Sequence, residues 1–116
     1  MEQSILTSIK KMLGPEEAYE HFDPDIIFHI NSTLAILTQL GVGPVSGFSI
    51  HDKTAVWSDF IQDDELMNMV PTYIYLKVKL GFDPPTVAAV LESMERQAAQ
   101  YEWRINVAAE RNKSES

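Results

Sequence analysis

Three histidines and the carboxylates near them are the residues whose types could carry out chemistry in this 116-residue chain. His21 is followed by Asp23 and Asp25, and imidazole together with carboxylate groups can bind a metal ion. The two aspartates are explained more simply by a turn and a helix start, which Asp favours. His29 lies three residues before Ser32 on a predicted helix, at the edge of the core or in water. We therefore predict no metal site here.

Other groups that could react or bind phosphate lack the sequence context that such sites need. The serines do not lie in the G-x-S-x-G context of a nucleophile. The glycine-rich residues 41–47 lack the lysine of a phosphate-binding loop, and the acidic residues 63–65 lack the ligand spacing of a calcium loop. Cysteine is absent, which excludes disulfides and thiolate chemistry. We predict no catalytic residue, no cofactor and no metal.

Composition describes one small folded domain. Hydrophobic residues make up 45% of the chain and charged residues 22%, which is ordinary for a globular protein. The formal net charge of −8 disfavours ordinary nucleic-acid binding, although an acidic protein can surround DNA without gripping it. No apolar run approaches the roughly 18 residues that span a bilayer. Residues 1–14 are apolar only periodically, so we expect neither a signal peptide nor membrane association.

The dominant element is a long helix predicted from Asp83 to about Arg111. Apolar residues recur there at spacings of three and four, which places them on one side of a helix. Asp83 suits the N-cap and Pro84 the first helical position. At ~1.5 Å per residue the helix would be roughly 40 Å long, so the other helices must pack along it or leave part of it bare. The stripe contains Val87, Leu91, Met94, Ala98, Tyr101, Ile105 and Ala108, widened by Val90.

Two shorter helices are predicted in the first third of the chain. Apolar spacing indicates a short amphipathic helix over residues 5–13, with a possible single turn opening at Pro15. A longer helix begins at Asp23 and ends before Gly41, because glycine readily adopts the left-handed conformation that follows many helices.

The next predicted helix contains a proline. It begins at the acidic residues 63–65, whose charge suits a helix N-terminus, and it ends at Gly81. Pro71 removes one backbone hydrogen bond and crowds the preceding turn. We therefore expect either a kink at Pro71 or a helix that begins near Val70.

Helical spacing disappears in the loop of residues 42–62. There Phe48, Ile50 and Val56 alternate with polar residues, which indicates two short strands or an extended excursion. Together the patterns predict an all-α fold, a bundle of about four helices with a protruding loop that could form a short β-hairpin. We expect a single domain over residues 1–111 and a flexible tail over 112–116.

Two tryptophans raise the question of a partner. Trp57 and Phe60 either pin the loop onto the helices or contact another subunit. Trp103 and Arg104 project away from the stripe that contains Tyr101. Because Trp, Tyr and Arg are enriched at interface hot spots, a partner contact and an intramolecular wrap both stay open for this pair.

Several motifs, taken in order, resemble a known family. FDPDI, QLGVG, W-S-D-F and YIYLKVKLGFDPP are ordinary helix and turn patterns one by one, but their order and spacing are specific. From about Leu6 to Ala109 the chain is similar to the small head–tail connectors, or adaptors, of long-tailed bacteriophages and prophages of Gram-positive bacteria. Pro71 departs from the family pattern and leaves the start of its helix open.

This resemblance implies a structural virion protein and not an enzyme. Proteins of this family are helical bundles with a protruding loop, and they form a homo-oligomeric ring, typically dodecameric, beneath the portal. The ring extends the DNA channel and offers a docking platform for the stopper or tail-completion protein. Genomic DNA would pass through without sequence-specific binding. The expected location is the head–tail neck of the virion, after synthesis in the host cytoplasm.

Interface residues are carried over from the family by position. The C-terminal segment would dock onto the portal, and the loop would contact neighbouring subunits or the next ring. The portal-docking residues are Trp103, Arg104, Val107 and Arg111. The loop residues are Phe48, Ile50, Trp57 and Phe60. Two competing hypotheses are a freestanding helical interaction or regulatory module, and a small acid–base enzyme that uses His29 or His21.

Overall fold

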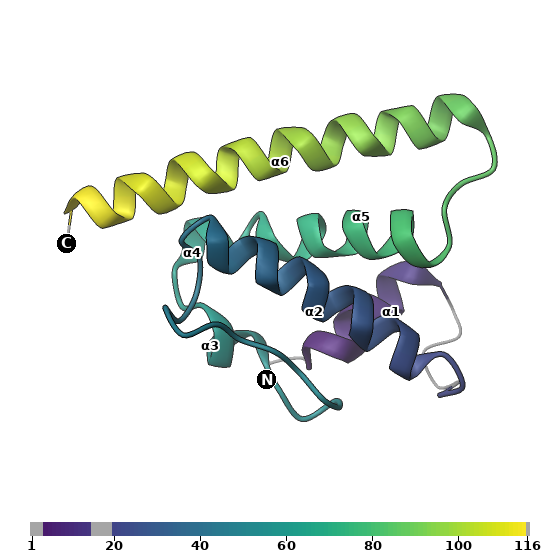
Figure 1. Cartoon of the computed structure of the whole chain (residues 1–116), viewed down its shortest axis with the longest axis horizontal. Helices are drawn as coiled ribbons and strands as arrows, with labels where there is room; N and C mark the ends of the chain where they lie inside the picture. Colours follow the sequence, from purple (N-terminus) through teal and green to yellow (C-terminus); the bar gives the residue numbers. More distant parts are fainter. Residues whose placement is uncertain (1–3, 15–19, 116) are drawn as a thin grey trace.

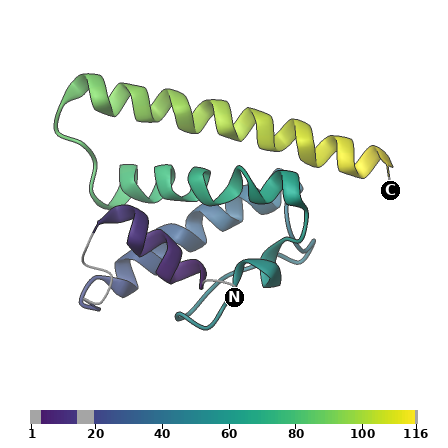
Figure 2. The same ribbon diagram turned by 180° about the vertical axis from the view of Figure 1, so that it is seen from behind.

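Helices make up most of the chain in a computed structural model, which describes residues 4–14 and 20–115, without the side chains of 113–115. No residue in that part belongs to a strand, and one isolated bridge joins Ser4 to Val56. The predicted all-α fold is confirmed, whereas the turn predicted at Pro15 lies outside the described residues. The helices are α1 (Ile5–Leu13), α2 (Asp23–Gln39), α3 (Trp57–Phe60), α4 (Asp64–Met67), α5 (Val70–Phe82) and α6 (Ala88–Glu115) (Figures 1 and 2).

The end of α2 follows from one glycine. Gly41 has a φ of 92°, in the left-handed region that favours glycine. Its N–H donates to the Thr38 carbonyl at 3.1 Å, and the N–H of Val42 donates to the Leu37 carbonyl at 2.9 Å. This pair of bonds is the Schellman ending, which satisfies two carbonyls that the helix leaves unpaired. The predicted end of this helix is confirmed.

Pro71 does not kink a helix, because α5 begins beside it. Val70 is the first residue of α5, so Pro71 lies in the first turn, where its missing N–H costs nothing. The acidic residues before it form the separate short helix α4, and the side chain of Asp63 accepts a hydrogen bond from the N–H of Leu66 at 2.9 Å. The second of the two predicted alternatives is therefore the observed one.

The predicted start of the long helix at Asp83 and Pro84 is wrong. The N–H of Asp83 donates to the Lys79 carbonyl at 3.0 Å, and its carboxylate lies 2.7 Å from the Lys79 ammonium, so Asp83 ends α5. Pro85 disfavours helical geometry at Pro84, because the residue before a proline is pushed out of the α region. The chain therefore turns at 84–87 and α6 starts at Ala88. The helix continues through residues 112–115, which the sequence assigns to a flexible tail. The flexibility of these residues stays a prediction.

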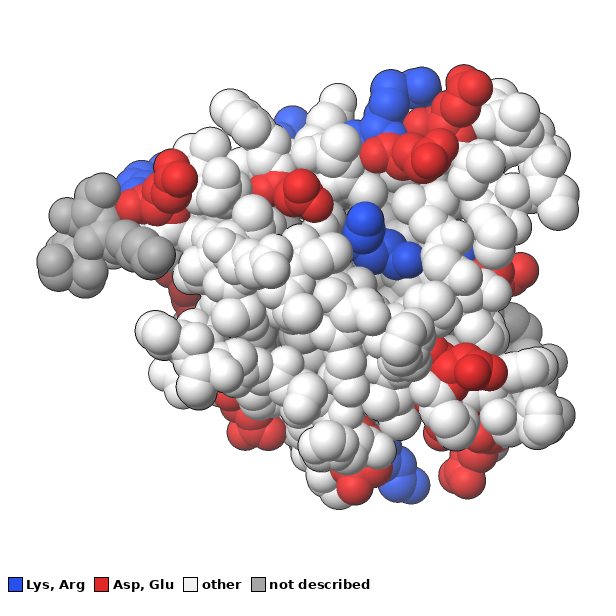
Figure 3. Space-filling model, in the orientation of Figure 1, with Lys and Arg blue, Asp and Glu red and all other residues white. Residues whose placement is uncertain are grey.

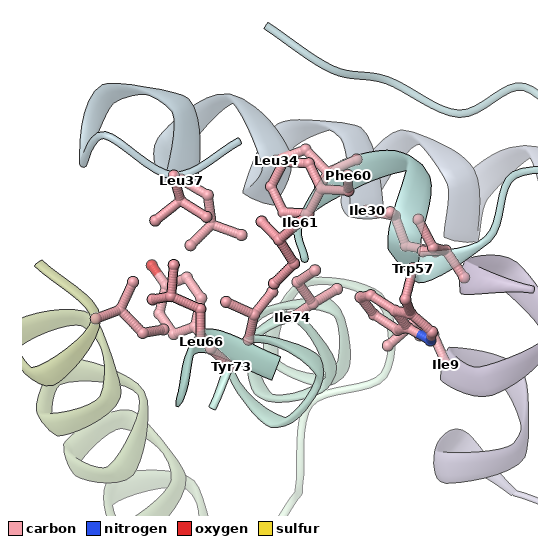
Figure 4. Close-up of a cluster of buried hydrophobic side chains, with 14 of the residues drawn as sticks. Ile9, Ile30, Leu34, Leu37, Trp57, Phe60, Ile61, Leu66, Tyr73 and Ile74 are labelled. Atoms are coloured by element: carbon pink, nitrogen blue, oxygen red, sulfur yellow. The ribbon is translucent and has the colours of Figure 1, made fainter. Parts of the chain in front are cut away.

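The core is organised around α5, which packs against α1, α2 and α6. Tyr73, Ile74 and Val78 of α5 are fully buried, and Figure 4 shows two of them among side chains from α2, α3 and α4. On α6 the stripe is buried at Ala98 and Ile105 and near the C-terminus. Val87 and Val90 are 60% and 48% exposed, so of the two expected alternatives the bundle leaves this part of the helix bare. The 84–87 turn carries that end of α6 away from the bundle (Figure 1).

The loop between α2 and α4 is an extended excursion that contains α3, and it does not form the β-hairpin. Asn31 of α2 accepts a hydrogen bond from the N–H of Ile50 at 2.8 Å and donates one to the Ile50 carbonyl at 2.9 Å. The N–H of Ile5, at the start of α1, donates to the Ala55 carbonyl at 2.9 Å. The loop backbone therefore finds its partners on two helices and needs no strand pairing.

One polar contact joins α5 to α6 and has a consequence at alkaline pH. Tyr73 is fully buried, and its hydroxyl donates to a carboxylate oxygen of Glu102 at 2.6 Å. Burial raises the pKa of Tyr73 well above its usual value, and the hydrogen bond and negative charge of Glu102 raise it further. The folded state thus holds the proton more tightly than the unfolded state. The contribution of Tyr73 to the free energy of unfolding is therefore complete below pH ~10, the pKa of an unfolded tyrosine. It is lost as the pH rises through the pKa of the folded state.

We expect the free energy of unfolding to fall above pH ~10 by at most about 1.4 kcal/mol per pH unit from this group. Tyr73→Phe should remove that slope and cost about 1–3 kcal/mol at neutral pH, because Glu102 loses its donor. Glu102→Gln should keep most of the slope, since burial is the largest cause of the shift. Urea unfolding at a series of pH values measures all three proteins. An unchanged slope in Tyr73→Phe would contradict this role.

Candidate functional site

The residues that could have supported chemistry are not brought together. Within the described residues no group of three His, Asp or Glu side chains lies close enough to hold a metal ion. Asp23 forms an ion pair with the buried Lys10, 2.8 Å away, so its carboxylate is used between α1 and α2. His21 is exposed, whereas His29 is half-buried beside Gly81 of α5. A Cβ on Gly81 would lie 2.8 Å from the His29 ring, so His29 packs between helices.

The aromatic residues of the loop belong to the core. Trp57 is 6% exposed, and its indole N–H donates to the Ser8 hydroxyl of α1 at 3.1 Å. Ile50 and Phe60 are also buried, and the half-buried Phe48 ring packs 5.2 Å from the Phe60 ring. The pinning alternative is therefore the observed one. The interface role carried over to these four residues stays a prediction, and the exposed parts of the loop would have to fulfil it.

The outer side of α6 is the opposite case. Trp103 is 68% exposed and Val107 is 41% exposed, one helical turn apart. The buried Ile105 lies on the other side of the helix, so Trp103 points away from the core. Trp103 therefore does not pack against another part of the same chain, and of the two alternatives the partner contact stays open. A single exposed tryptophan contributes a large apolar surface that water solvates poorly.

All the arginines of the chain accompany this tryptophan. Arg96, Arg104 and Arg111 are spaced by eight and seven residues, so they fall within an arc of roughly 80° on one side of α6. All three are exposed, and Arg111 forms an ion pair with Glu65 of α4. Figure 3 shows basic side chains along the edge of the molecule over α6, with acidic ones beside them. We call Trp103, Arg104, Val107 and Arg111 the outer α6 surface.

Comparison with known proteins decides the family. A family model described as phage connector protein matches residues 5–112, which is nearly the whole chain. This chain belongs to the phage connector family. No curated protein and no solved structure matches it. The resemblance predicted from the motifs is therefore confirmed at the level of the family, and with it a structural role at the phage head–tail connection.

Membership of the connector family fixes the broad nature of the protein. The family is structural and not catalytic, and its proteins contact other head and tail proteins of the phage in the virion neck. Within the described part of this connector, no helix is both long and apolar enough to cross a membrane.

Two features of the connector escaped prediction from sequence. The Asn31 contacts with Ile50 join residues 19 positions apart, and an asparagine within a helix carries no local sign of such a bond. Which part of the long helix is left bare was not predictable either, because the spacing at Val87 continues the buried stripe. The gathering of all arginines on one side of α6 was readable from their spacing.

Proposed function

We propose that this connector forms a ring of twelve copies beneath the portal and there extends the channel through which DNA passes. The outer α6 surface carries the proposal, because it is an exposed aromatic and basic surface on the largest helix of the domain. Trp and Arg are the residues that most often supply the binding energy of an interface. A helix with a buried side and such an outer side is suited to hold a second protein.

The portal is the partner proposed for this surface. A matching portal site would offer an apolar pocket for Trp103 and Val107, with carboxylates opposite Arg104. Arg111 already contacts Glu65, so docking would add a carboxylate to an existing ion pair or exchange its partner. Because exposed ion pairs are screened by salt, this docking should weaken as the salt concentration rises.

The opposite side of the molecule is proposed to receive the next component. The loop of residues 42–62 protrudes from the bundle on the far side from α6 (Figure 1). Its buried residues Ile50, Trp57 and Phe60 would hold the loop in shape, and Phe48 with the exposed loop positions would contact the stopper or a neighbouring subunit. The net charge of −8 suits a channel along which DNA slides without binding.

Electron microscopy of the purified chain, alone and mixed with the portal of the same phage, tests this function. A ring that caps the portal only when the chain is added is the expected result. A monomer that does not associate with the portal would overturn the connector ring and favour the freestanding helical interaction module.

Trp103→Ala should weaken portal binding at least tenfold, the loss expected when a hot-spot side chain is truncated. Met12→Ala is the matched control, since Met12 is an exposed apolar residue on α1. Binding to immobilised portal, followed at two salt concentrations, measures both variants. Equal affinities for the two variants would show that the portal contacts another surface.

A further inference from the structure

An uncharged stretch runs through the first half of the chain. Residues 26–50 contain no Asp, Glu, Lys or Arg, although 22% of the whole chain is charged. Burial explains part of it, because Ile30, Leu34 and Leu37 form the inner side of α2. It does not explain the outer side, where a helix facing water ordinarily carries charged residues.

The outer side of α2 is accessible and neutral. Its exposed residues recur at spacings of three and four, and the turn that follows adds a fully exposed valine. The Ser32 hydroxyl donates to the Phe28 carbonyl at 3.0 Å, so the polar group in the middle of this side already has a partner. Figure 3 shows the middle of this face without red or blue side chains over α2. We call Phe28, Ser32, Ala35, Gln39 and Val45 the α2 face.

A second neutral surface lies at the turn between α5 and α6. Residues 84–91 carry no charge, and Val87 and Val90 are 60% and 48% exposed. We call these residues the α6 corner. In Figure 1 the α6 corner lies at the right end of the molecule, and the turn after α2 lies toward the left. The two surfaces are different, since one is the side of a helix and the other is a turn. They approach each other where His29 packs against Gly81 and diverge toward the end of α2.

We propose that the α2 face of one copy receives the α6 corner of a neighbouring copy. Each copy carries a net charge of −8, so copies repel one another, and the repulsion is weakest where the touching surfaces carry no charged groups. The centres of protein interfaces are likewise depleted of charge. The small side chains of Ser32 and Ala35, with Phe28 to one side, leave room for two valines to approach the helix.

Head-to-tail contact between two different surfaces is what a ring requires, whereas two identical surfaces would stop at a dimer. This inference thus rests on the proposed ring. A helix side roughly 25 Å long and 10 Å wide offers a few hundred Å², which is less than the about 800 Å² per partner of a stable pair. One such contact is weak, so copies associate when the ring closes or a portal holds them side by side.

Disulfide trapping tests the contact without interference, because the chain has no cysteine of its own. The Ala35→Cys and Val87→Cys variants are combined in the presence of the portal and then oxidised. They should form a disulfide-linked dimer that contains one copy of each variant. Neither variant should form a disulfide-linked dimer by itself. Met12→Cys paired with Ala35→Cys is the control and should stay unlinked. A disulfide in Ala35→Cys alone would overturn the head-to-tail contact in favour of a symmetric one.

The outcome separates this inference from the proposed function. Rings visible by electron microscopy without a disulfide between the cysteines introduced at positions 35 and 87 would overturn the contact. The connector ring would then still stand. Absence of rings together with absence of the disulfide at millimolar protein would overturn both. Ala35→Glu should reduce ring formation at least tenfold without changing stability, because Glu is a good helix former at an exposed position. Met12→Glu, which adds the same charge at an exposed position of α1 outside every proposed contact surface, should assemble normally.

Discussion

Replacement of Trp57 by alanine should lower the free energy of unfolding by about 3–5 kcal/mol, the range for truncating a buried large aromatic. Figure 4 shows the Trp57 ring beside Ile9 of α1, and its indole N–H donates to Ser8 of the same helix. The alanine variant loses this packing and leaves a cavity between α1 and α3 that neither short helix can close. Urea unfolding followed by circular dichroism measures the loss.

Trp103→Ala is the matched control, because it removes the same side chain from an exposed position on α6. We expect its free energy of unfolding to stay within about 0.5 kcal/mol of the wild-type value. The two variants then divide the tryptophans into one that holds the fold and one that serves a partner. Equal destabilisation by the two replacements would contradict that division.

Gly43→Ala should destabilise the protein by about 2–5 kcal/mol through two separate effects. Gly43 has a φ of 82°, and an L side chain in the left-handed region costs roughly 1–2 kcal/mol. A Cβ at this position would also overlap the Phe60 ring, with Phe60 Cδ1 only 2.9 Å away. Phe60 is buried, so its ring can yield only by disturbing the core, which adds about 1–3 kcal/mol.

Gly47→Ala separates these two effects. Gly47 has a φ of 96°, but a Cβ there would meet no atom within 4 Å. It should therefore cost only the backbone strain of about 1–2 kcal/mol. The difference between the two variants in thermal and urea unfolding reports the close approach of the 41–47 turn to Phe60. If both variants lose the same stability, the Phe60 contact does not constrain the turn.

Local chemistry made most helix boundaries predictable. The short helix over residues 5–13 is found with those limits, and Gly41 and Pro71 mark the end of α2 and the start of α5. Each of these signals acts within a few residues, through a missing N–H or a left-handed backbone. The sequence alone is sufficient for such features.

The start of α6 shows where local chemistry misleads. Asp83-Pro84 has the same two residues as Asp23-Pro24, and the second pair does lie in the first turn of a helix. The first pair differs through Pro85, which disfavours helix at Pro84, and through Lys79, which draws Asp83 back to α5. Whether a cap residue faces forward or backward depends on what surrounds it.

The candidate surfaces were predictable only in part, because exposure depends on which elements cover a residue. Trp57 and Trp103 are the same residue type in amphipathic surroundings, yet α1 covers the first and no described element covers the second. The resemblance to connectors supplied the docking role of the C-terminal segment, and the position of Trp103 on the outer side of α6 is compatible with it. The neutral α2 face needed the fold before it could be separated from the core.

The uneven attachment of α6 has a mechanical consequence. Toward its C-terminus the helix is held by Tyr73 through Glu102, by Asp63 through Asn112 and by Glu65 through Arg111. At the other end its first turns project beyond the bundle. α6 is therefore a cantilever, in which a slight tilt at the fixed end becomes a larger displacement at the free tip. In the proposed ring, such subunits would let the diameter adjust to the portal and the stopper while each core stays rigid.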